Sequence, residues 1–171
     1  MKVYLVGYMG VGKSTIGKKL ARRLETTFYD LDSIIVSEWG MSIPEIFRKK
    51  GEKFFRTVEA EALEKQIKNS QSFVLATGGG AVLREGAMEK LRDSGLVIWL
   101  KMSPKMLASR LEQSKEKRPL LDGVNNYELF ITNHLKERIP FYSKAQIHYA
   151  ASQNDAEHLE ILAREIADYS K

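Results

Sequence analysis

The chain has 171 residues, with 27 Lys or Arg against 22 Asp or Glu, which gives a formal net charge of +5. Charged residues make up 29% and apolar residues 43%, a balance typical of one globular domain that excludes long disorder. The absence of cysteine excludes disulfides, zinc–thiolate sites and thiol catalysis.

The same composition limits the partners that we expect. No apolar run reaches the ~18 residues of a membrane span, and the N-terminus lacks the small-residue cleavage site of a signal peptide. The basic residues form no dense stripe with interleaved aromatic residues, so no nucleic-acid partner is expected. We therefore expect a cytoplasmic protein with no membrane partner and, since no long apolar surface helix is predicted, a monomer.

The first predicted element is a buried strand at residues 3–6, followed by a glycine-rich loop and an amphipathic helix. The loop Gly7–Ser14 fits the pattern G-x-x-x-x-G-K-[S/T] at every fixed position. Glycines let backbone N–H groups wrap a phosphate, and the helix N-terminus adds positive potential. We expect Lys13 to reach the β- and γ-phosphates of a nucleotide and the Ser14 hydroxyl to bind Mg²⁺.

A second strand is expected at residues 28–30, where two carboxylates, Asp30 and Asp32, follow the apolar run. Alternation in an extended segment places both on the same side, at the strand end where parallel sheets bind ligands. One could then hold Mg²⁺ through water while the other accepts hydrogen bonds from a hydroxylated acceptor. The spacing fits equally well a structural role in which Asp32 caps a helix over 33–39.

A helix that begins at Ser42, just before a proline, and a longer charged helix over 52–69 are expected next, separated by Gly51. Arg56 and Glu59 lie one turn apart on the longer helix. In such a pair the glutamate could orient the arginine guanidinium so that its N–H groups are ready to bind a substrate carboxylate. The spacing alone favours a plainer alternative, an exposed ion pair that contributes about 0.5 kcal/mol.

A third strand at residues 73–76 runs into the glycines at 78–80. Three glycines let a ligand approach backbone amides closely, although a flexible turn explains them as well. A helix near 85–93 and a fully apolar strand at 96–100 are expected after them.

The next helix opens at Ser103, and the polar segment 113–126 follows it. The composition and length of this segment predict a mobile lid. Arg118 within it is placed to close over the transferring phosphate.

The last predicted elements are a helix, a weak strand at 145–151 and a final helix. Pro140 is expected to end the first of these helices, and the plainest role of Arg138 is a favourable charge at that helix end. No chemistry is assigned to the histidines at 134, 148 and 158. The predicted buried faces of the two helices are Tyr127, Ile131, Leu135 and Ile139 in the first, and Leu159, Leu162, Ile166 and Tyr169 in the second.

Strands and helices alternate from end to end without an internal repeat. This alternation, with strictly apolar strands, predicts an α/β fold in which helices cover both faces of a parallel sheet.

Several segments taken together resemble the shikimate kinase family of P-loop kinases. The resemblance covers essentially the whole chain, in the order and spacing of that family. The segments that carry it are GYMGVGKST at 7–15, YDLD at 29–32, IF at 46–47 before GE at 51–52, FRTVE at 55–59, ATGGG at 76–80, RPLL at 118–121 and RIPFY at 138–142.

The resemblance implies a P-loop kinase fold: a parallel five-stranded sheet with helices on both faces, in one kinase domain over 1–171. It implies a mobile lid over about 113–126 and a substrate-binding helical region over about 32–62. It also implies transfer of the γ-phosphoryl group of ATP to the 3-hydroxyl of shikimate, with Mg²⁺ as cofactor.

The resemblance also assigns site residues by their positions in these motifs. The catalytic residues it implies are Lys13, Asp32 and Arg118. Those implied on the ATP side are Gly10, Val11, Gly12, Lys13, Ser14, Thr15, Arg110, Arg118 and Gln153. Those implied for shikimate are Asp32, Arg56, Gly78, Gly79, Gly80 and Arg138. Those implied for Mg²⁺ are Ser14 and Asp30.

Two other functions stay open on the sequence. One is another small P-loop kinase, acting on gluconate or a nucleoside monophosphate, and the other is a nucleotide-binding module without catalysis. The pair of Asp32 and Arg56 favours the shikimate kinase, because a binding module has no need for both.

Overall fold

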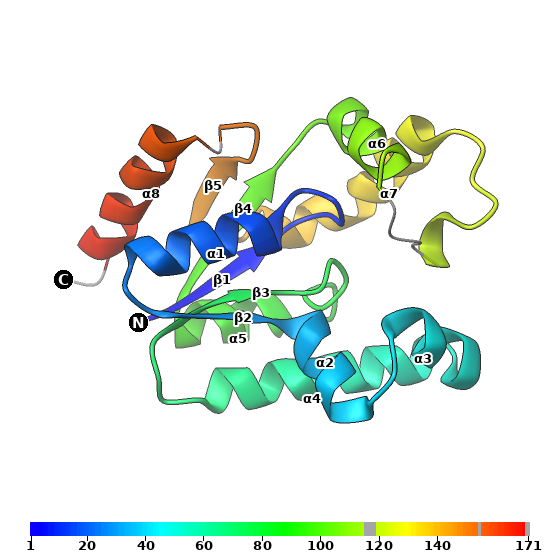
Figure 1. Ribbon diagram of the computed structural model, residues 1–171, viewed down its shortest axis with the longest axis horizontal. Helices are drawn as coiled ribbons and strands as arrows, with labels where there is room; N and C mark the ends of the chain where they lie inside the picture. The colour runs from blue at the N-terminus through cyan, green and yellow to red at the C-terminus, as the bar shows by residue number, and fades with distance from the viewer. Residues whose placement is uncertain (115–118, 154, 170–171) are drawn as a thin grey trace.

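A computed structural model describes residues 1–114, 119–153 and 155–169 (Figure 1). The strands are Lys2–Val6 (β1), Thr27–Asp30 (β2), Phe73–Ala76 (β3), Leu96–Lys101 (β4) and Ile147–Ala150 (β5). The helices are Lys13–Arg23 (α1), Leu31–Trp39 (α2), Ile43–Lys50 (α3), Glu52–Lys68 (α4), Ala87–Ser94 (α5), Pro104–Glu112 (α6), Tyr127–Tyr142 (α7) and Ala156–Asp168 (α8), with a 3₁₀ turn at Pro119–Leu121.

The strands form one parallel sheet in the order β2-β3-β1-β4-β5, as the alternating pattern predicts. In the centre of the sheet, Leu5 of β1 lies beside Ala76 of β3 and Ile98 of β4. The chain therefore passes from one side of β1 to the other between β3 and β4. Open α/β sheets bind ligands at the carboxyl ends of the strands beside such a switch in direction.

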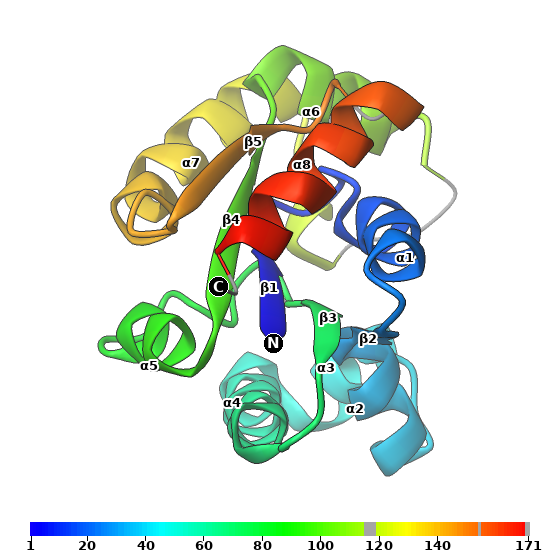
Figure 2. The same cartoon turned by 90° about the vertical axis from the view of Figure 1, so that its left-hand side faces the viewer.

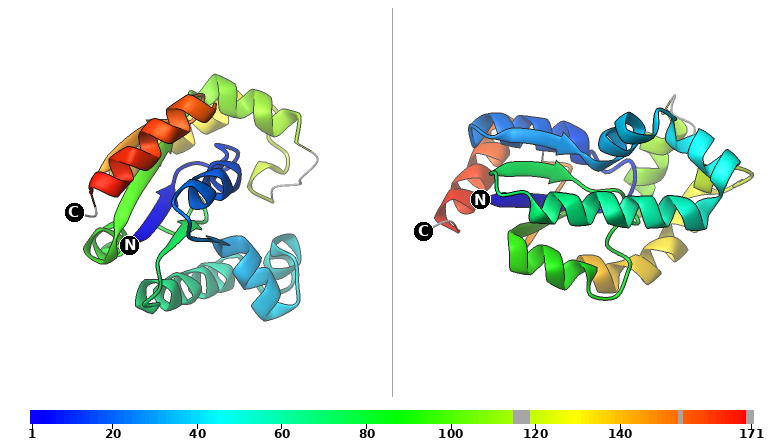
Figure 3. Two further views of the ribbon diagram at one scale, coloured as in Figure 1. Left: turned by 60° about the vertical axis from the view of Figure 1, so that its left-hand side comes forward. Right: turned by 90° about the horizontal axis from the view of Figure 1, so that it is seen from below.

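Helices cover both faces of the sheet, which confirms the predicted layers. Figure 2 shows α1 and α8 on one face, and α4, α5 and α7 on the other. Figure 3 shows α4 and α5 lying across that second face. At the carboxyl ends of the strands, α2 and α3 pack on α4, and α6 packs on α7. Within the described residues, no helix is long and apolar enough to cross a membrane.

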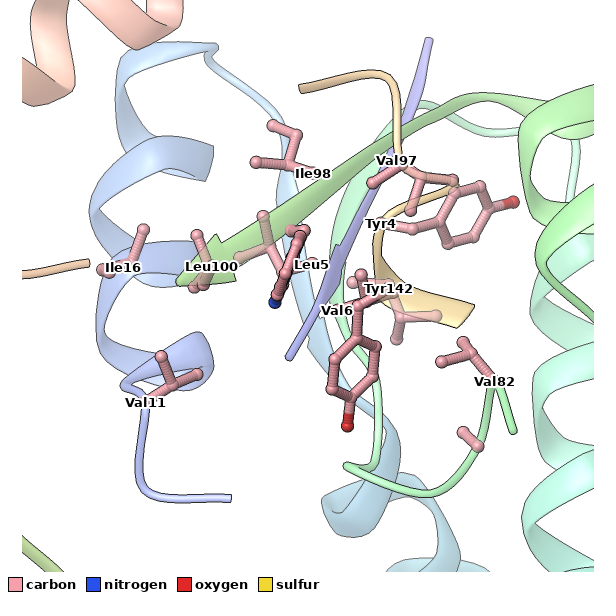
Figure 4. Close-up of a cluster of buried hydrophobic side chains, with 14 of the residues drawn as sticks. Tyr4, Leu5, Val6, Val11, Ile16, Val82, Val97, Ile98, Leu100 and Tyr142 are labelled. Atoms are coloured by element: carbon pink, nitrogen blue, oxygen red, sulfur yellow. The ribbon is translucent and has the colours of Figure 1, made fainter. Parts of the chain in front are cut away.

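The core holds β1 rigidly from both sides. Its side chains alternate between the two faces, so Leu5 points toward α1 while Tyr4 and Val6 point the other way (Figure 4). The buried residues around them include Val11, Ile16, Ile98 and Leu100 on the first side, and Val82, Val97 and Tyr142 on the second. The loop between β1 and α1 therefore begins at a strand whose position is fixed by packing on both faces.

The helix boundaries follow the predicted signals in most places. Ser42 begins α3 with a capping box, in which its hydroxyl accepts from Glu45 N and the Glu45 carboxylate accepts from Ser42 N. Ser103 caps α6 through Met106 N. Gly51 separates α3 from α4 as expected.

The expected end of α7 at Pro140 is wrong, because the helix runs through that proline to Tyr142. Pro140 lacks an N–H to donate within the helix, but Ser143 N still donates to the carbonyl of Ile139 at 2.9 Å. Tyr142 is fully buried, and its hydroxyl donates to Gly79 O at 2.6 Å. Tertiary packing thus extends the helix past a residue that usually ends one.

Three smaller predictions are also wrong. Ile139 is 42% exposed and Tyr169 is 59% exposed, so neither belongs to the buried face of its helix. The last strand is shorter than 145–151 and spans Ile147–Ala150. In α7 the buried residues are Ile131, Leu135, Arg138 and Tyr142, so Arg138 is buried although it was expected as a charge at the helix end.

Candidate active site

The glycine-rich loop connects β1 to α1 at the centre of the sheet. Gly12 caps α1 at φ 100°, a backbone conformation that favours glycine, and no side chain caps the helix start. Lys13 Nζ donates to the carbonyl oxygens of Gly7 at 2.8 Å and Tyr8 at 3.1 Å, which curls the loop around the ammonium group. The uncapped helix N-terminus and the lysine together suit a phosphate group.

A hollow of about 190 Å³ lies against this loop. Five of the residues expected on the ATP side line it together with two carboxylates, Asp30 at the end of β2 and Asp32 just beyond it. The full lining is Met9, Gly10, Gly12, Lys13, Ser14, Thr15, Asp30, Asp32, Thr77 and Gly79. The structure thus brings most of the residues expected at the phosphates into one place.

Ser14 and Asp30, the residues expected at Mg²⁺, are direct neighbours. The Ser14 hydroxyl donates to Asp30 Oδ2 at 2.5 Å. The described residues contain no cluster of three or more His, Cys, Asp or Glu that could hold a metal without help. One hydroxyl and one carboxylate fit Mg²⁺, which keeps several waters and takes its other ligands from substrate phosphates.

Asp30 and Asp32 do not alternate along one strand, because β2 ends at Asp30 and α2 already begins at Leu31. Asp30, not Asp32, is the helix cap, and its Oδ1 accepts from Ser33 N at 3.3 Å. Asp32 lies in the first turn of α2, yet it still lines the hollow at the phosphate loop. A helical turn therefore delivers the geometry that an extended segment was expected to give.

A second hollow, of about 90 Å³, opens beside the first. Met9, Asp32 and Gly79 line both hollows. The other residues that line the second are Ile43, Phe47, Phe55, Arg56, Glu59, Gly78, Gly80, Leu120 and Arg138. Asp32 thus stands where a molecule in the second hollow would meet a phosphate in the first.

The glycines at 78–80 each lie against a charged side chain of the second hollow. A Cβ on the first would collide with the Glu59 carboxylate, and a Cβ on the third would collide with the Arg56 guanidinium. A Cβ on the middle glycine would lie 3.5 Å from Arg138 Nη1. Close packing against charged side chains therefore explains the first and third glycines, whereas a Cβ on the middle one would make only ordinary contacts.

Arg56 and Glu59 form the expected ion pair, but it is not a surface pair. Arg56 Nη1 lies 2.8 Å from Glu59 Oε2, and Arg56 Nη2 lies 3.2 Å from Glu52 Oε1. The Glu59 side chain is only 3% exposed. Burial raises the pKa of the Glu59 carboxyl, and the Arg56 charge opposes that rise. Glu59 is absent from the site residues that the resemblance implies, although its spacing from Arg56 indicated that the two could pair.

Arg138 is 4% exposed and faces the second hollow, so it is not a charge at a solvated helix end. Its Nη1 donates to Gly79 O at 2.9 Å, and the Tyr142 hydroxyl donates to the same oxygen at 2.6 Å. Arg138 Nε has no hydrogen-bond partner among the described residues. A buried guanidinium with an unused donor is suited to an anionic ligand.

The remaining expected site residues have mixed outcomes. Arg110 of α6 donates from Nη1 to Val11 O at 3.2 Å, which places its guanidinium beside the phosphate loop. Gln153 makes backbone hydrogen bonds to nearby residues: its N–H donates to Ala150 O, and its carbonyl accepts from the Tyr149 hydroxyl. These contacts do not test its expected place on the ATP side. Arg118 lies outside the described residues.

The fold and the two joined hollows together define a P-loop kinase of a small molecule. The shikimate kinase family model matches residues 9–170. A shikimate kinase from Parabacteroides distasonis is 40% identical over 154 residues, which cover 89% of this chain and 88% of that protein. The chain belongs to the shikimate kinase family, whose members are ATP-dependent kinases.

Solved structures agree with this assignment. The crystal structure of shikimate kinase from Bacteroides thetaiotaomicron is 34% identical with a TM-score of 0.86, over 99% of this chain and 98% of that one. The shikimate kinase from Acinetobacter baumannii in complex with shikimate is 36% identical with a TM-score of 0.83, over 99% and 92%. A gluconokinase from Sinorhizobium meliloti, at 17% identity and a TM-score of 0.58, shares the fold alone.

Proposed function

We propose that this chain transfers the γ-phosphoryl group of ATP to the 3-hydroxyl of shikimate, giving shikimate 3-phosphate and ADP for aromatic amino acid biosynthesis. The observation that carries the proposal is the common wall of Asp32 and Gly79 between the phosphate hollow and the arginine-lined hollow. Phosphoryl transfer needs donor and acceptor side by side, with a group that orients the attacking hydroxyl between them.

The second hollow takes the acceptor. Arg56 and Arg138 bind its carboxylate, because charge-assisted bonds from planar guanidinium groups match that group. Asp32 accepts a hydrogen bond from the attacking hydroxyl and orients it toward the phosphate. In a loose transition state this orientation contributes more than removal of the proton, which Asp32 can also accept.

The first hollow takes the ATP phosphates. Lys13 and the N–H groups at the start of α1 bind the β- and γ-phosphates and stabilise the charge that develops there. Ser14 and Asp30 hold Mg²⁺, which when bound neutralises phosphate charge. Arg110 is assigned to the adenine side, with Gln153, and Arg118 to the transferring phosphate.

A coupled assay of ADP release over a panel of acceptors tests the proposed function. Shikimate is expected to give turnover, with gluconate and nucleoside monophosphates at least about 100-fold lower in kcat/KM, because they lack the matching carboxylate and hydroxyl arrangement. Equal or faster turnover with another acceptor would assign the chain to a different substrate. ATP binding without turnover on any acceptor would indicate a binding module.

Substitution Glu59→Gln tests the buried charge behind Arg56. It removes the counter-charge at 2.8 Å while keeping the size of the side chain. We expect the KM for shikimate to rise about tenfold and the free energy of unfolding to fall by about 1–3 kcal/mol. Steady-state kinetics and urea unfolding measure the two effects. Glu52→Gln is the matched control, because Glu52 binds the same guanidinium from an exposed position and should change stability by less than about 1 kcal/mol.

We further propose that residues 1–171 act as one kinase domain, with the acceptor region at about 32–62 and a lid at about 113–126. The polar composition of the latter segment supports a lid that closes on ligands. Hydrogen exchange in residues 113–126 is expected to slow when an ATP analogue and shikimate are both bound. Unchanged exchange with and without the two ligands would argue against closure.

We also propose that the chain acts as a monomer in the cytoplasm. Light scattering with size-exclusion chromatography tests the first point, since a monomer has a mass of 19.5 kDa. Cell fractionation tests the second.

A further inference from the structure

His134 of α7 lies between the acceptor hollow and the phosphate loop, and the roles proposed above do not use it. Its Nε2 is 2.9 Å from Arg138 Nη2, and its Nδ1 is 2.9 Å from the Tyr8 hydroxyl oxygen. Tyr8 belongs to the phosphate loop, and its carbonyl oxygen accepts from Lys13. One imidazole ring thus bridges the arginine of one hollow and the loop of the other.

The chemistry of the two partners fixes the protonation state of the ring. A guanidinium has only donors, so Nε2 accepts from Arg138 and carries no proton. The neutral ring then carries its proton on Nδ1, which donates to the Tyr8 hydroxyl. A protonated ring could not make the first of these bonds, because both of its nitrogens would be donors.

The contact with His134 determines how Arg138 is turned. Gly79 O holds Nη1 and His134 holds Nη2, both at 2.9 Å. Two contacts on different nitrogens fix the plane of the guanidinium, with Nε left without a partner among the described residues. Because the group is rigid and planar, fixing its plane before the ligand arrives lowers the cost of binding.

We propose that neutral His134 is a positioning residue, which sets the Arg138 guanidinium for the acceptor carboxylate and links it to the phosphate loop, so that acceptor binding weakens when the ring gains a proton. The proposal rests on the proposed function, since it assumes that Arg138 binds the acceptor.

Burial and the neighbouring arginine charges favour the neutral form of the ring, whereas the neighbouring glutamates oppose it. Arg138 and Glu137 approach from α7, Tyr8 from the phosphate loop, and Arg56 and Glu52 from α4. Burial and the Arg138 charge lower the pKa of His134 from its ordinary value of 6.5. The ring is therefore neutral above that lowered pKa, and it gains a proton only as the pH falls through it. The KM for shikimate should accordingly rise only as the pH falls below 6.5, the ordinary value for histidine.

Kinetics of His134→Leu and His134→Gln between about pH 5.5 and 8 test the proposal, because an ordinary carboxyl group stays ionised over that range. His134→Leu is expected to raise the KM for shikimate about tenfold at pH 8, with the KM for ATP within about twofold. In His134→Gln the side-chain carbonyl can still accept from Arg138, so the KM at pH 8 should be partly restored. Because an amide does not titrate, the acid rise should be absent in this variant.

His158→Gln is the matched control, since His158 lies on α8, where it contacts Asp155, and should keep the acid rise of the wild type. A wild-type KM in His134→Leu, or an acid rise that persists in His134→Gln, would overturn the inference.

Arg138→Ala distinguishes an error in the role of His134 from an error in the proposed function. If Arg138→Ala weakens shikimate binding while the His134 variants do not, only the role of His134 is wrong. If Arg138→Ala changes nothing, the acceptor assignment itself is wrong.

Discussion

Replacing Lys13 with alanine is expected to lower kcat about 10³-fold or more, because the ammonium group offsets charge that grows on the phosphates in the transition state. The fold should survive the substitution. The side chain is partly exposed, and it donates hydrogen bonds to the carbonyl oxygens of Gly7 and Tyr8 in its own loop. Loss of these bonds should cost about 1 kcal/mol of unfolding free energy.

Turnover and thermal melting have to be measured on the same preparation. Lys18→Ala is the matched control on α1, since Lys18 is exposed and lies over the Phe28 ring at 6.0 Å. It should keep near wild-type turnover and stability. Near wild-type kcat in Lys13→Ala with an unchanged melting temperature would exclude the phosphate role of this lysine.

The parts of the site that the sequence predicts correctly are those set by local chemistry. The phosphate loop depends on glycines, a lysine and a serine at fixed offsets between a buried strand and a helix, and all of these lie within eight residues. The caps at Ser42 and Ser103 are local in the same sense. Such features need no knowledge of what packs against them.

The parts that the sequence alone does not predict depend on contacts between distant segments. Arg138 looks like a charge at a helix end until the packing of α7 places it 2.9 Å from Gly79 O, 59 residues earlier in the chain. The sequence suggests that Glu59 belongs to an exposed ion pair, whereas the fold packs Gly78 closely against its carboxylate. Residue spacing reveals that a pair exists, whereas only the fold reveals that the pair is buried and what it faces.

The family resemblance allows such distant contacts to be predicted for residues within its motifs, but not for residues outside them. Arg56 and Arg138 are both assigned to the acceptor by their motifs, and the structure places both on the wall of one hollow. His134 lies outside the motifs that carry the resemblance, and only its two contacts mark it.

Removal of either acceptor arginine, by Arg56→Ala or Arg138→Ala, is expected to lower kcat/KM for shikimate about 100-fold or more. Loss of a charge-assisted contact to a desolvated carboxylate costs a few kcal/mol, at ~1.4 kcal/mol per tenfold. Arg56→Lys should not restore activity, because a point charge cannot reproduce the planar fork that Glu59 orients. ATP affinity without shikimate should stay within about twofold, since neither arginine lines the phosphate hollow.

Calorimetric titration of ATP and steady-state kinetics with shikimate separate the acceptor role from a purely structural one. Arg48→Ala on α3 is the matched control, because Arg48 is exposed and lines neither hollow. If both arginines served only stability, their variants would melt earlier but keep their kcat/KM below the transition. Equal losses of ATP and shikimate binding would instead mean that the second hollow is not the acceptor site. A loss confined to shikimate, in variants that still melt cooperatively, is the result that the geometry predicts, because the two hollows share Asp32 and Gly79 but neither arginine.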